Sequence, residues 1–335
     1  MALLKVEQGR RLRYGLIGPG THANEQLFPA LAEMEGAELV AVAARSAERA
    51  RVAAIRWGGL MYTGEWMDLL DPGAVDAIVV AGTPELHAEV IQAGLERGVS
   101  VFAEKPPAPS TTALEHLVAA ERRSKRNAIA FVGFNFPYGT SYVKLREALA
   151  PRGEIRRFDI RMVSSKPLEA TRSDESIEEA LLYGLGLHGF DMALRSMGVP
   201  DSVDVARAQV DTMRMSLTIS LGYTDGRLAT IHIGNSSNRL EYRCEMVTAD
   251  GTTGVLDQHN TLVLAEVGEN PRKAVLDSKE TIRYEWPSRR GGYARTGYLP
   301  ELRSFQESVI RGIPSSSSLE ASLQSYEVID RALAG

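Results

Sequence analysis

The stretch Arg13-Tyr14-Gly15-Leu16-Ile17-Gly18-Pro19-Gly20-Thr21-His22-Ala23 decides the fold of this chain. Its first five residues predict a short buried strand, and apolar residues at helical spacing follow its last residue. The spacing Gly-x-Gly-x-x-Ala joins the two: Gly18 permits a tight turn, Gly20 lets backbone approach a pyrophosphate, and Ala23 allows close packing of helix on strand. The stretch therefore predicts a dinucleotide site, with amides at the helix start facing the phosphates.

Alternating strands and helices continue from this stretch to residue 132. Strands are expected at 37–44, 75–80, 99–103 and 128–132, and helices at 47–57, 66–70, 85–97 and 112–124. Alternation at this interval indicates a parallel sheet with right-handed crossovers. The sequence thus predicts an α/β fold that begins with a Rossmann dinucleotide-binding domain over residues 1–132.

A second pattern begins at residue 133. Helices are expected at 142–149 and 177–197, with a strand at 155–163 between them. From 203 to 284, short strands separated by Gly, Asn and Asp turns predict an antiparallel sheet with helices on one side. Two further helices are expected at 301–311 and 319–333, and residues 289–298 are expected to form a loop that covers a ligand. We predict an α+β domain with an open, mostly antiparallel sheet over residues 133–335.

Glu104-Lys105-Pro106 follows the apolar run 99–103 without a linker. This places Lys105 at the carboxyl end of a buried strand, the edge at which open α/β sheets bind ligands. An ammonium on a partly dry rim can have its pKa lowered toward neutrality and then donate or accept a proton. Lys105 is therefore the candidate acid–base residue, and the alternative is a solvated lysine in a strand-to-helix turn.

The residues after the second strand bear on the choice of cofactor. A carboxylate at this point holds the 2′-hydroxyl of NAD, whereas this chain has Arg45 and Ser46, with Arg49 and Arg51 a turn later. An arginine and a hydroxyl suit a 2′-phosphate, so NADP is favoured over NAD. The alternative is that Arg45 begins a solvated helix face. The loop from Gly82 to His87 leaves the next strand on the same carboxyl edge, although His87 fits better in the first turn of a helix than as a catalyst.

Gly184, His188 and Asp191 lie at spacings of four and three, which puts them on one face of the predicted helix 177–197. His188 can exchange a proton with a substrate oxygen, and Asp191 can fix its tautomer or raise its basicity. The alternative is a core histidine satisfied by a neighbouring carboxylate. His188 and Asp191 supply only two ligands, so no metal site is predicted.

Composition excludes several classes of protein. With 335 residues, 44% hydrophobic and 24% charged, the chain is globular and long enough for two domains. The formal net charge of -5 gives no reason to expect nucleic acid or an anionic membrane, and no apolar run approaches the ~20 residues of a membrane span. Arg10-Arg11 is followed by no cleavage region, and the single Cys244 excludes an internal disulfide. A cytoplasmic location is therefore predicted.

Four motifs together resemble the Gfo/Idh/MocA family, named after glucose-fructose oxidoreductase, inositol dehydrogenase and a rhizopine-catabolism protein. They are residues 18–23, Glu104-Lys105-Pro106, residues 133–136 (Gly-Phe-Asn-Phe) and residues 186–191 (Gly-Leu-His-Gly-Phe-Asp). The resemblance covers nearly the whole chain. It implies reversible hydride transfer between a nicotinamide and a sugar or cyclitol carbinol, with the open sheet serving substrate and subunit contacts in a homodimer or homotetramer.

The resemblance also implies roles for single residues. Lys105 and His188 fall on catalytic positions, with Lys105 holding or protonating the reacting oxygen. Residues expected to contact the cofactor are Gly18, Gly20, Thr21, His22, Arg45, Ser46, Gly82, His87, Glu104, Lys105 and Asn135. The chain departs from the family pattern at Gly184, where relatives have an aspartate that binds substrate hydroxyls, and at Pro137, where an arginine is common. Tyr183, Lys166 and Asp191 are the candidate substrate contacts.

These observations predict an NADP-dependent oxidoreductase, with NAD possible, that acts on a secondary alcohol or ketone of a sugar, aminocyclitol or nucleotide-linked sugar. Gly184 keeps two alternatives open. One is a reductase of an imine or enone, because a site without the aspartate has less need of a substrate rich in hydroxyl groups. The other is a nucleotide-binding regulatory protein that keeps the fold and has lost turnover.

Overall fold

The computed structural model describes residues 11–124, 128–166, 176–266 and 292–335, together with the backbone of Ile282–Glu285. The chain divides into two units. Unit 1 contains the residues up to Tyr138 and Gly292–Leu323, and unit 2 contains Gly139–Gly291 and Gln324–Gly335. The division differs from the predicted boundary after residue 132. Unit 1 extends to Tyr138, and it also includes Gly292–Leu323, which the sequence analysis assigned to the second domain.

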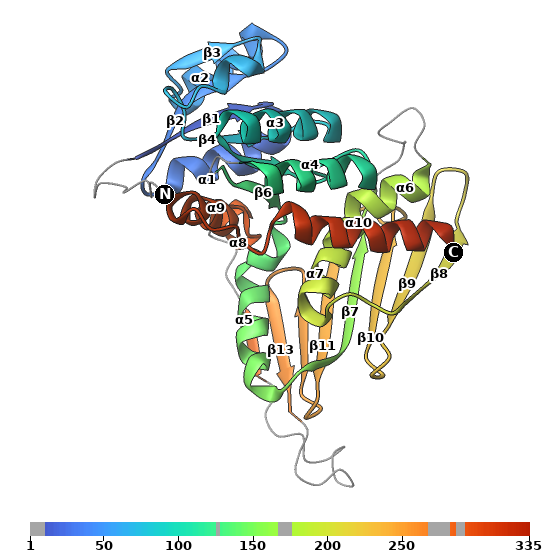
Figure 1. Cartoon of the computed structure of the whole chain (residues 1–335). Helices are drawn as coiled ribbons and strands as arrows, with labels where there is room; N and C mark the ends of the chain where they lie inside the picture. Colours follow the sequence, from blue (N-terminus) through green and yellow to red (C-terminus); the bar gives the residue numbers. More distant parts are fainter. Residues whose placement is uncertain (1–10, 125–127, 167–175, 267–281, 286–291) are drawn as a thin grey trace, which may run out of the picture. The chain divides into compact units, whose positions relative to one another are not determined.

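Unit 1 is built on a six-stranded sheet in which every pair of neighbours is parallel. In spatial order the strands are β3 (Met61–Thr63), β2 (Ala37–Ala43), β1 (Leu12–Ile17), β4 (Ala77–Val80), β5 (Ser100–Glu104) and β6 (Ala130–Gly133) (Figure 1). The direction of strand order reverses between β1 and β4, which makes the carboxyl ends of these strands the expected ligand crevice. The predicted Rossmann fold is confirmed.

Helices follow the strands of unit 1 as the sequence predicted. They are α1 (Phe28–Glu33), preceded by a π-helical turn over Ala23–Leu27, then α2 (Ala47–Trp57), α3 (Pro84–Arg97), α4 (Thr111–Arg123), α8 (Gly292–Arg295) and α9 (Tyr298–Arg311), with 3₁₀ turns at Trp66–Leu69 and Phe136–Tyr138. Ser46, Thr83 and Ser110 cap three of these helices by accepting a backbone N–H. Residues 292–298 are the described part of the expected loop at 289–298, and there the expectation is wrong except for a two-residue turn, because Gly292–Arg295 form α8 and Tyr298 begins α9.

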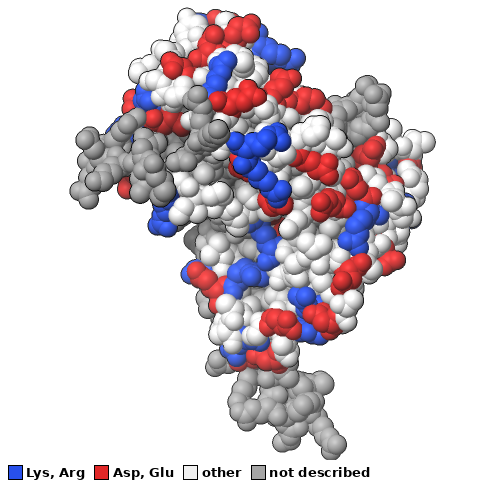
Figure 2. Space-filling view, viewed as in Figure 1, with Lys and Arg blue, Asp and Glu red and all other residues white. Residues whose placement is uncertain are grey.

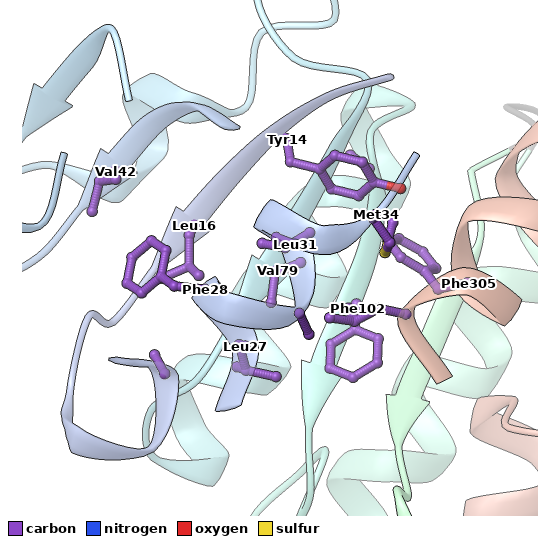
Figure 3. Close-up of a cluster of buried hydrophobic side chains, with 14 of the residues drawn as sticks. Tyr14, Leu16, Leu27, Phe28, Leu31, Met34, Val42, Val79, Phe102 and Phe305 are labelled. Atoms are coloured by element: carbon purple, nitrogen blue, oxygen red, sulfur yellow. The ribbon is translucent and has the colours of Figure 1, made fainter. Parts of the chain in front are cut away.

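Phe305 of α9 explains why a C-terminal segment belongs to unit 1. Its ring centroid lies 5.8 Å from that of Phe102 on β5, 5.7 Å from that of Phe131 on β6 and 6.4 Å from that of Tyr14 on β1. Figure 3 shows Phe305 reaching into the apolar cluster beside Tyr14 and Phe102. The sheet of unit 1 therefore completes its core only when α9 packs on it.

Unit 2 contains an eight-stranded sheet in which only β7 and β10 run parallel. Its spatial order is β14 (Ile282–Glu285), β13 (Thr261–Ala265), β12 (Thr253–Asp257), β11 (Glu241–Thr248), β7 (Ile155–Val163), β10 (Leu228–Gly234), β9 (Met215–Gly222) and β8 (Ser202–Gln209). Alternate residues along β9 are buried, as expected for a sheet with one face covered. The predicted, mostly antiparallel sheet is confirmed.

Helices cover one face of this sheet (Figure 1). They are α5 (Thr140–Leu149), with a 3₁₀ turn at Ala150–Arg152, α6 (Ile177–Leu181), a π-helical turn over Leu182–Gly186, α7 (Leu187–Met197) and the end of α10 (Leu319–Ala334). Gly189 brings α7 close to the sheet, since a Cβ there would lie 2.7 Å from Cγ2 of Ile231 and 3.0 Å from Cε of Met162. Gly189 is thus a packing contact of α7 with β10 and β7.

Acidic and basic side chains are interspersed on the face shown in Figure 2, in keeping with the formal net charge of -5. That face presents no extended basic surface of the kind that follows a nucleic-acid backbone. No helix of the described residues has both the length and the apolar character needed to span a bilayer.

Candidate active site

The glycine turn after β1 is held by a close approach to β4. Gly18 has a φ of +86°, and a Cβ at this position would lie 2.0 Å from the carbonyl oxygen of Ala81. The N–H of Gly18 donates to the carbonyl of Ala43 at the end of β2 at 3.0 Å. By contrast, a Cβ at Gly20 would meet nothing within 4 Å. Gly18 is thus required by the protein itself, while Gly20 leaves open space where a pyrophosphate can approach the backbone.

Asn24 braces this turn and was missed in the sequence. Its Nδ2 donates to the carbonyls of Pro19, at 3.0 Å, and Gly20, at 2.9 Å, and its Oδ1 accepts from Nε1 of Trp57 at 3.0 Å. The side chain therefore fixes the turn to α2. An asparagine four residues after the second glycine is the signal that could have identified it.

The three arginines near the end of β2 differ in their surroundings. Arg51 is bound to Glu48, with its Nε and Nη2 each 2.8 Å from a carboxylate oxygen. Within the described part of the chain, neither Arg45 nor Arg49 forms an ion pair. The Ser46 hydroxyl accepts the N–H of Arg49 at 3.4 Å, and it can still donate its own proton. Two exposed guanidinium groups and a hydroxyl donor are therefore available beside the dinucleotide fingerprint.

A cavity of about 300 Å³ lies between the glycine turn and α2. Its lining residues are Pro19, Asn24, Glu48, Arg49, Val52, Ala53 and Arg56. Arg56 also stacks over Trp57, with its guanidinium carbon 5.2 Å from the ring centroid. The lining places two cationic side chains, Arg49 and Arg56, beside apolar residues and one carboxylate, Glu48.

Lys105 follows β5 directly and lies at the carboxyl rim of the unit 1 sheet, as predicted. Its side chain is partly exposed. Desolvation by burial lowers the pKa of Lys105 below its usual value, and the negative charge of the neighbouring Glu104 opposes part of that effect. A lysine with a lowered pKa can act as an acid or a base nearer to neutral pH than a solvated one.

Glu104 pairs with His22 from the turn after β1. Nε2 of His22 lies 3.0 Å from Oε1 of Glu104, whose side chain is only 9% exposed. The ring of His22 also meets Tyr298 of α9 edge-on, with centroids 5.2 Å apart. Burial lowers the pKa of His22, but the hydrogen bond and charge of Glu104 outweigh it, and the pKa of His22 is raised. Three separate segments of unit 1 thus meet beside Lys105.

His87, which was expected to contact the cofactor, forms hydrogen bonds inside the protein. The residue is 1% exposed. The backbone N–H of Gly82 donates to its Nε2 at 2.8 Å, so Nδ1 carries the proton and donates to the carbonyl of Pro106 at 2.8 Å. Burial lowers the pKa of His87 and keeps the ring neutral. The histidine therefore joins the loop after β4 to the loop that carries Lys105, and the amide of Gly82 is also occupied by this bond.

Asn135 is likewise used inside the protein. Its Nδ2 donates to the carbonyl of Thr296 at 2.8 Å, and the residue is 3% exposed. The amide that was expected to contact the cofactor instead ties the end of β6 to the segment between α8 and α9. Thr21, in contrast, is exposed at the start of the first helix, where an anion can meet its backbone amide.

In unit 2, His188 lies in the first turn of α7, directly after the π-helical turn. Such turns are frequent at functional sites because they displace side chains from the regular helical register. Gly184 lies within this turn, and a Cβ at Gly184 would meet nothing within 4 Å. The position where the family pattern has an aspartate is therefore open.

Asp191, which was expected to contact substrate and to orient His188, is engaged by Arg195. Nε of Arg195 lies 2.8 Å from both carboxylate oxygens, and Asp191 is 2% exposed. Burial raises the pKa of Asp191, and the charge and hydrogen bond of Arg195 oppose this shift. The carboxylate is thus part of the α7 core.

Tyr183 also has a structural partner, since its hydroxyl donates to Oδ1 of Asp330 on α10 at 3.0 Å and its ring packs edge-on against Tyr326. Its expected contact with a substrate stays a prediction, and the hydroxyl is engaged by Asp330 in this structure. Lys166 is exposed just after β7, where its backbone is held by the Ser164 side chain. Of the candidate substrate contacts, only Lys166 is exposed.

The family model, the two relatives and the solved structure described here are all named as oxidoreductases or dehydrogenases. A family model described as "Oxidoreductase family, NAD-binding Rossmann fold" matches residues 12–134. Inositol 2-dehydrogenase 4 of Saccharopolyspora erythraea is 26% identical over 257 residues, which cover 73% of this chain and 74% of that protein. Inositol 2-dehydrogenase 2 of Paenarthrobacter aurescens is 26% identical over 333 residues, covering 94% and 96%. A solved dehydrogenase structure from Chromobacterium violaceum superimposes with a TM-score of 0.89 at 25% identity, covering 97% of this chain and 95% of that one.

Proposed function

We propose, from the premise that the chain belongs to the Gfo/Idh/MocA family of oxidoreductases, that it transfers hydride between NADP and a secondary alcohol or ketone of a sugar, an aminocyclitol or a nucleotide-linked sugar. The chain is an oxidoreductase with an NAD-binding Rossmann fold. Its relatives named inositol 2-dehydrogenase support a polyol or cyclic sugar as the substrate class. A homodimer or homotetramer in the cytoplasm remains a prediction.

One observation carries this proposal. The open glycine turn after β1 and Lys105 after β5 share the carboxyl rim of one parallel sheet, at the reversal of strand order. The space above Gly20 and the amides at the start of the first helix fit the pyrophosphate of a dinucleotide. When bound there, the nicotinamide supplies or takes up the hydride.

Lys105 and His188 are the proposed acid–base residues. In the direction of ketone reduction, the ammonium of Lys105 donates a proton from Nζ to the reacting oxygen, and in alcohol oxidation the neutral amine accepts it. The lowered pKa of Lys105 supports both roles near neutral pH. His188 is proposed to exchange a proton with a substrate oxygen through an imidazole nitrogen. The internal hydrogen bond of His87 to the carbonyl of Pro106 holds the loop that carries Lys105 without adding a reacting atom.

The preference for NADP is supported by the groups at the end of β2. Arg45 and Arg49 are exposed cations, and Ser46 keeps a hydroxyl proton to donate. Charge-assisted hydrogen bonds of this kind suit a 2′-phosphate, whereas a carboxylate would suit the free hydroxyl of NAD. Arg51 is a weaker candidate because its guanidinium already binds Glu48.

A second candidate function follows from Gly184. The open position in the π-helical turn leaves space and removes a carboxylate, which favours a substrate with fewer hydroxyls, such as an imine or enone. A nucleotide-binding protein without turnover is the third alternative. Reduction of imine or enone substrates with no activity on keto sugars would select the second candidate.

The deciding experiment pairs binding with turnover. Fluorescence titration of the purified protein with NADPH and NADH should give affinities that differ at least tenfold in favour of NADPH, which corresponds to about 1.4 kcal/mol. NADPH oxidation is then followed with a panel of keto sugars, keto cyclitols, imines and enones. Tight binding without turnover on any of them would support the regulatory alternative, and binding of neither nucleotide would contradict all three.

A further inference from the structure

Arg56 lines the cavity between the glycine turn and α2, and it is not among the residues expected to contact the cofactor. It follows Arg49 by seven residues, which is two helical turns along α2, so both side chains leave the helix on the same side. Pro19, from between the two glycines of the turn, lines the same cavity. The two arginines therefore border the turn that is expected to receive the pyrophosphate.

The charges of the lining favour an anion. The carboxylate of Glu48 also faces the cavity, but each of its oxygens already accepts a hydrogen bond from Arg51 at 2.8 Å. Among the residues that the structure describes, neither Arg49 nor Arg56 forms an ion pair. Two guanidinium groups thus line one cavity without a counter-charge from the described protein, and a phosphate monoester supplies the charge and the oxygen acceptors that they need.

The guanidinium of Arg56 is held by Trp57. Its central carbon lies 5.2 Å from the centroid of the Trp57 ring, within the range of a cation–π interaction. The Trp57 ring stacks on Phe28 with an interplanar angle of 3° and centroids 5.4 Å apart. Its Nε1 donates to Oδ1 of Asn24 at 3.0 Å, and the side-chain amide of Asn24 braces the glycine turn. A series of direct contacts therefore connects the glycine turn to a cation in the cavity.

We propose that Arg56 is a second cation for the 2′-phosphate of NADP, beside Arg49, and that Trp57 is a positioning residue that holds Arg56 toward the cavity. The inference rests on the proposed function, because it names a further residue that selects NADP over NAD. A guanidinium that is already stacked on an indole ring loses less conformational freedom on binding an anion than an unrestrained arginine does. Arg56 therefore contributes to selectivity although it lies in the last turn of α2, at the far end from the residues that follow β2.

The test measures the ratio of NADPH affinity to NADH affinity by fluorescence titration, and it needs no substrate. In Arg56→Gln the ratio should fall about 3- to 10-fold, with the loss confined to NADPH. Arg56→Lys keeps the charge but not the planar group that stacks on the indole, so its ratio should lie between those of Arg56→Gln and the wild type.

Arg123→Gln is the matched control. Arg123 is an exposed arginine in the last turn of α4, so its replacement removes the same charge from the same position of a helix. A cation there stabilises a helix through the helix dipole, and that role alone changes stability without changing the choice of nucleotide. The ratio of NADPH to NADH affinity should therefore stay at the wild-type value in Arg123→Gln.

Trp57→Leu tests the positioning role, because it removes the ring on which Arg56 stacks. The affinity ratio should fall in the wild-type background and should not fall further in the Arg56→Gln background. Disturbance of the turn through Asn24 weakens both nucleotides, so it leaves the ratio unchanged. An equal fall of the ratio in both backgrounds would overturn the role of Trp57. Should Trp57→Leu fail to fold, Trp57→Phe keeps an aromatic ring, and a fall as large as that of Arg56→Gln would overturn the role equally.

Adenosine 2′,5′-bisphosphate and adenosine 5′-monophosphate differ only in the 2′-phosphate, and their affinities by calorimetry should respond to Arg56→Gln as NADPH and NADH do. An unchanged ratio in Arg56→Gln, an equal loss for NADH, or the same fall in Arg123→Gln would overturn the role of Arg56. A wild type that prefers NADPH and keeps that preference in Arg56→Gln contradicts this inference alone. A wild type that prefers NADH contradicts the proposed NADP dependence and this inference with it, whereas NADPH binding without turnover contradicts only the proposed catalysis.

Discussion

Gly18 packs against Ala81 so closely that a Cβ on the glycine would lie 2.0 Å from the carbonyl oxygen of the alanine. This contact joins the first strand to the fourth in sequence, at the reversal of strand order. The turn that is expected to receive the dinucleotide is therefore held in place by the sheet before any ligand binds. Its shape depends on two glycines for different reasons, and the difference can be measured.

Gly18→Ala should destabilise unit 1 and weaken nucleotide binding. The substitution adds a Cβ at a φ of +86° and against a backbone atom, so we expect a loss of at least ~2 kcal/mol in the free energy of unfolding without cofactor. Gly20→Ala is the matched control, because a Cβ there meets nothing within 4 Å. Its stability should change by less than ~0.5 kcal/mol, while its NADPH affinity falls. Denaturant unfolding and fluorescence titration separate the two effects, and equal stability losses would contradict this account.

Lys105→Met should remove acid–base catalysis and spare cofactor binding. The methionine keeps most of the side-chain volume but has no proton to exchange, so kcat/KM on the preferred substrate should fall by about 10²- to 10⁴-fold. NADPH affinity should stay within about threefold, measured by the same titration. Near wild-type turnover in Lys105→Met would exclude the lysine from the reaction.

Arg49→Ala should weaken NADPH binding without affecting NADH. Loss of one charge-assisted hydrogen bond to the 2′-phosphate should reduce NADPH affinity roughly tenfold, about 1.4 kcal/mol. Arg51→Ala serves as control, since Arg51 lies on the same helix but is bound to Glu48. The affinity for NADPH should also depend less steeply on salt concentration in Arg49→Ala, whereas Arg51→Ala should leave this dependence unchanged. A similar loss for NADH would mean that Arg49 contacts another part of the nucleotide.

Arg195→Met should destabilise unit 2 in a pH-dependent way. Arg195 opposes the burial that raises the pKa of Asp191, so its removal leaves a buried, uncompensated carboxylate and raises that pKa further. Because the folded state then binds a proton more tightly than the unfolded state, stability falls as pH rises through the folded pKa. The loss should be about 3 to 5 kcal/mol at pH 7 and shrink as the pH approaches the ordinary pKa of an aspartate.

Asp191→Asn/Arg195→Met is the control for that effect. It removes the charge together with its partner, so it should be more stable than Arg195→Met at pH 7, and its difference from the wild type should vary little with pH. Urea unfolding at pH 5 and pH 7 gives both quantities. If the loss of stability in Arg195→Met is the same at both pH values, it comes from lost packing and not from an uncompensated charge on Asp191.

Phe305→Ala should destabilise unit 1, although Phe305 lies far in the sequence from the strands of that unit's sheet. Its ring contacts three aromatic residues of the sheet, so we expect a loss of about 3 to 5 kcal/mol. Ile310→Ala, on the same helix at a position that is 37% exposed, should cost less than ~1 kcal/mol. A chain that ends before Gly292 should not form a stable nucleotide-binding unit. Equal effects of the two substitutions would argue against a core role for α9.

Local patterns predicted most of the elements because their causes are local. The span of α2 matches the expected 47–57, since Ser46 caps its first turn and Gly58 ends it in the left-handed conformation. The strand expected at 155–163 is β7. Lys105 was placed at the sheet rim because a strand that is buried on both faces must end before a solvated group.

The partners of single polar groups could not be predicted in the same way. His87, Asn135, Tyr183 and Asp191 are residue types that bind ligands, yet each hydrogen-bonds within the protein. Nothing along the chain distinguishes a side chain that meets a ligand from one that meets a distant carbonyl. Asn24 was missed for the same reason. Its role in bracing the turn depends on two carbonyls of the glycine turn that accept hydrogen bonds from its side chain.

The sequence by itself determined the two kinds of sheet, the glycine turn and the position of Lys105 after its strand, since periodicity and glycine geometry act over a few residues. Only the tertiary structure decided that α9 completes unit 1, that His22 meets Glu104 and that Asp191 belongs to Arg195. Those outcomes depend on burial, and burial is a property of segments that meet across long separations in the chain. The same burial that lowers the pKa of Lys105 thus arises from contacts that the lysine's own neighbours in the sequence do not encode.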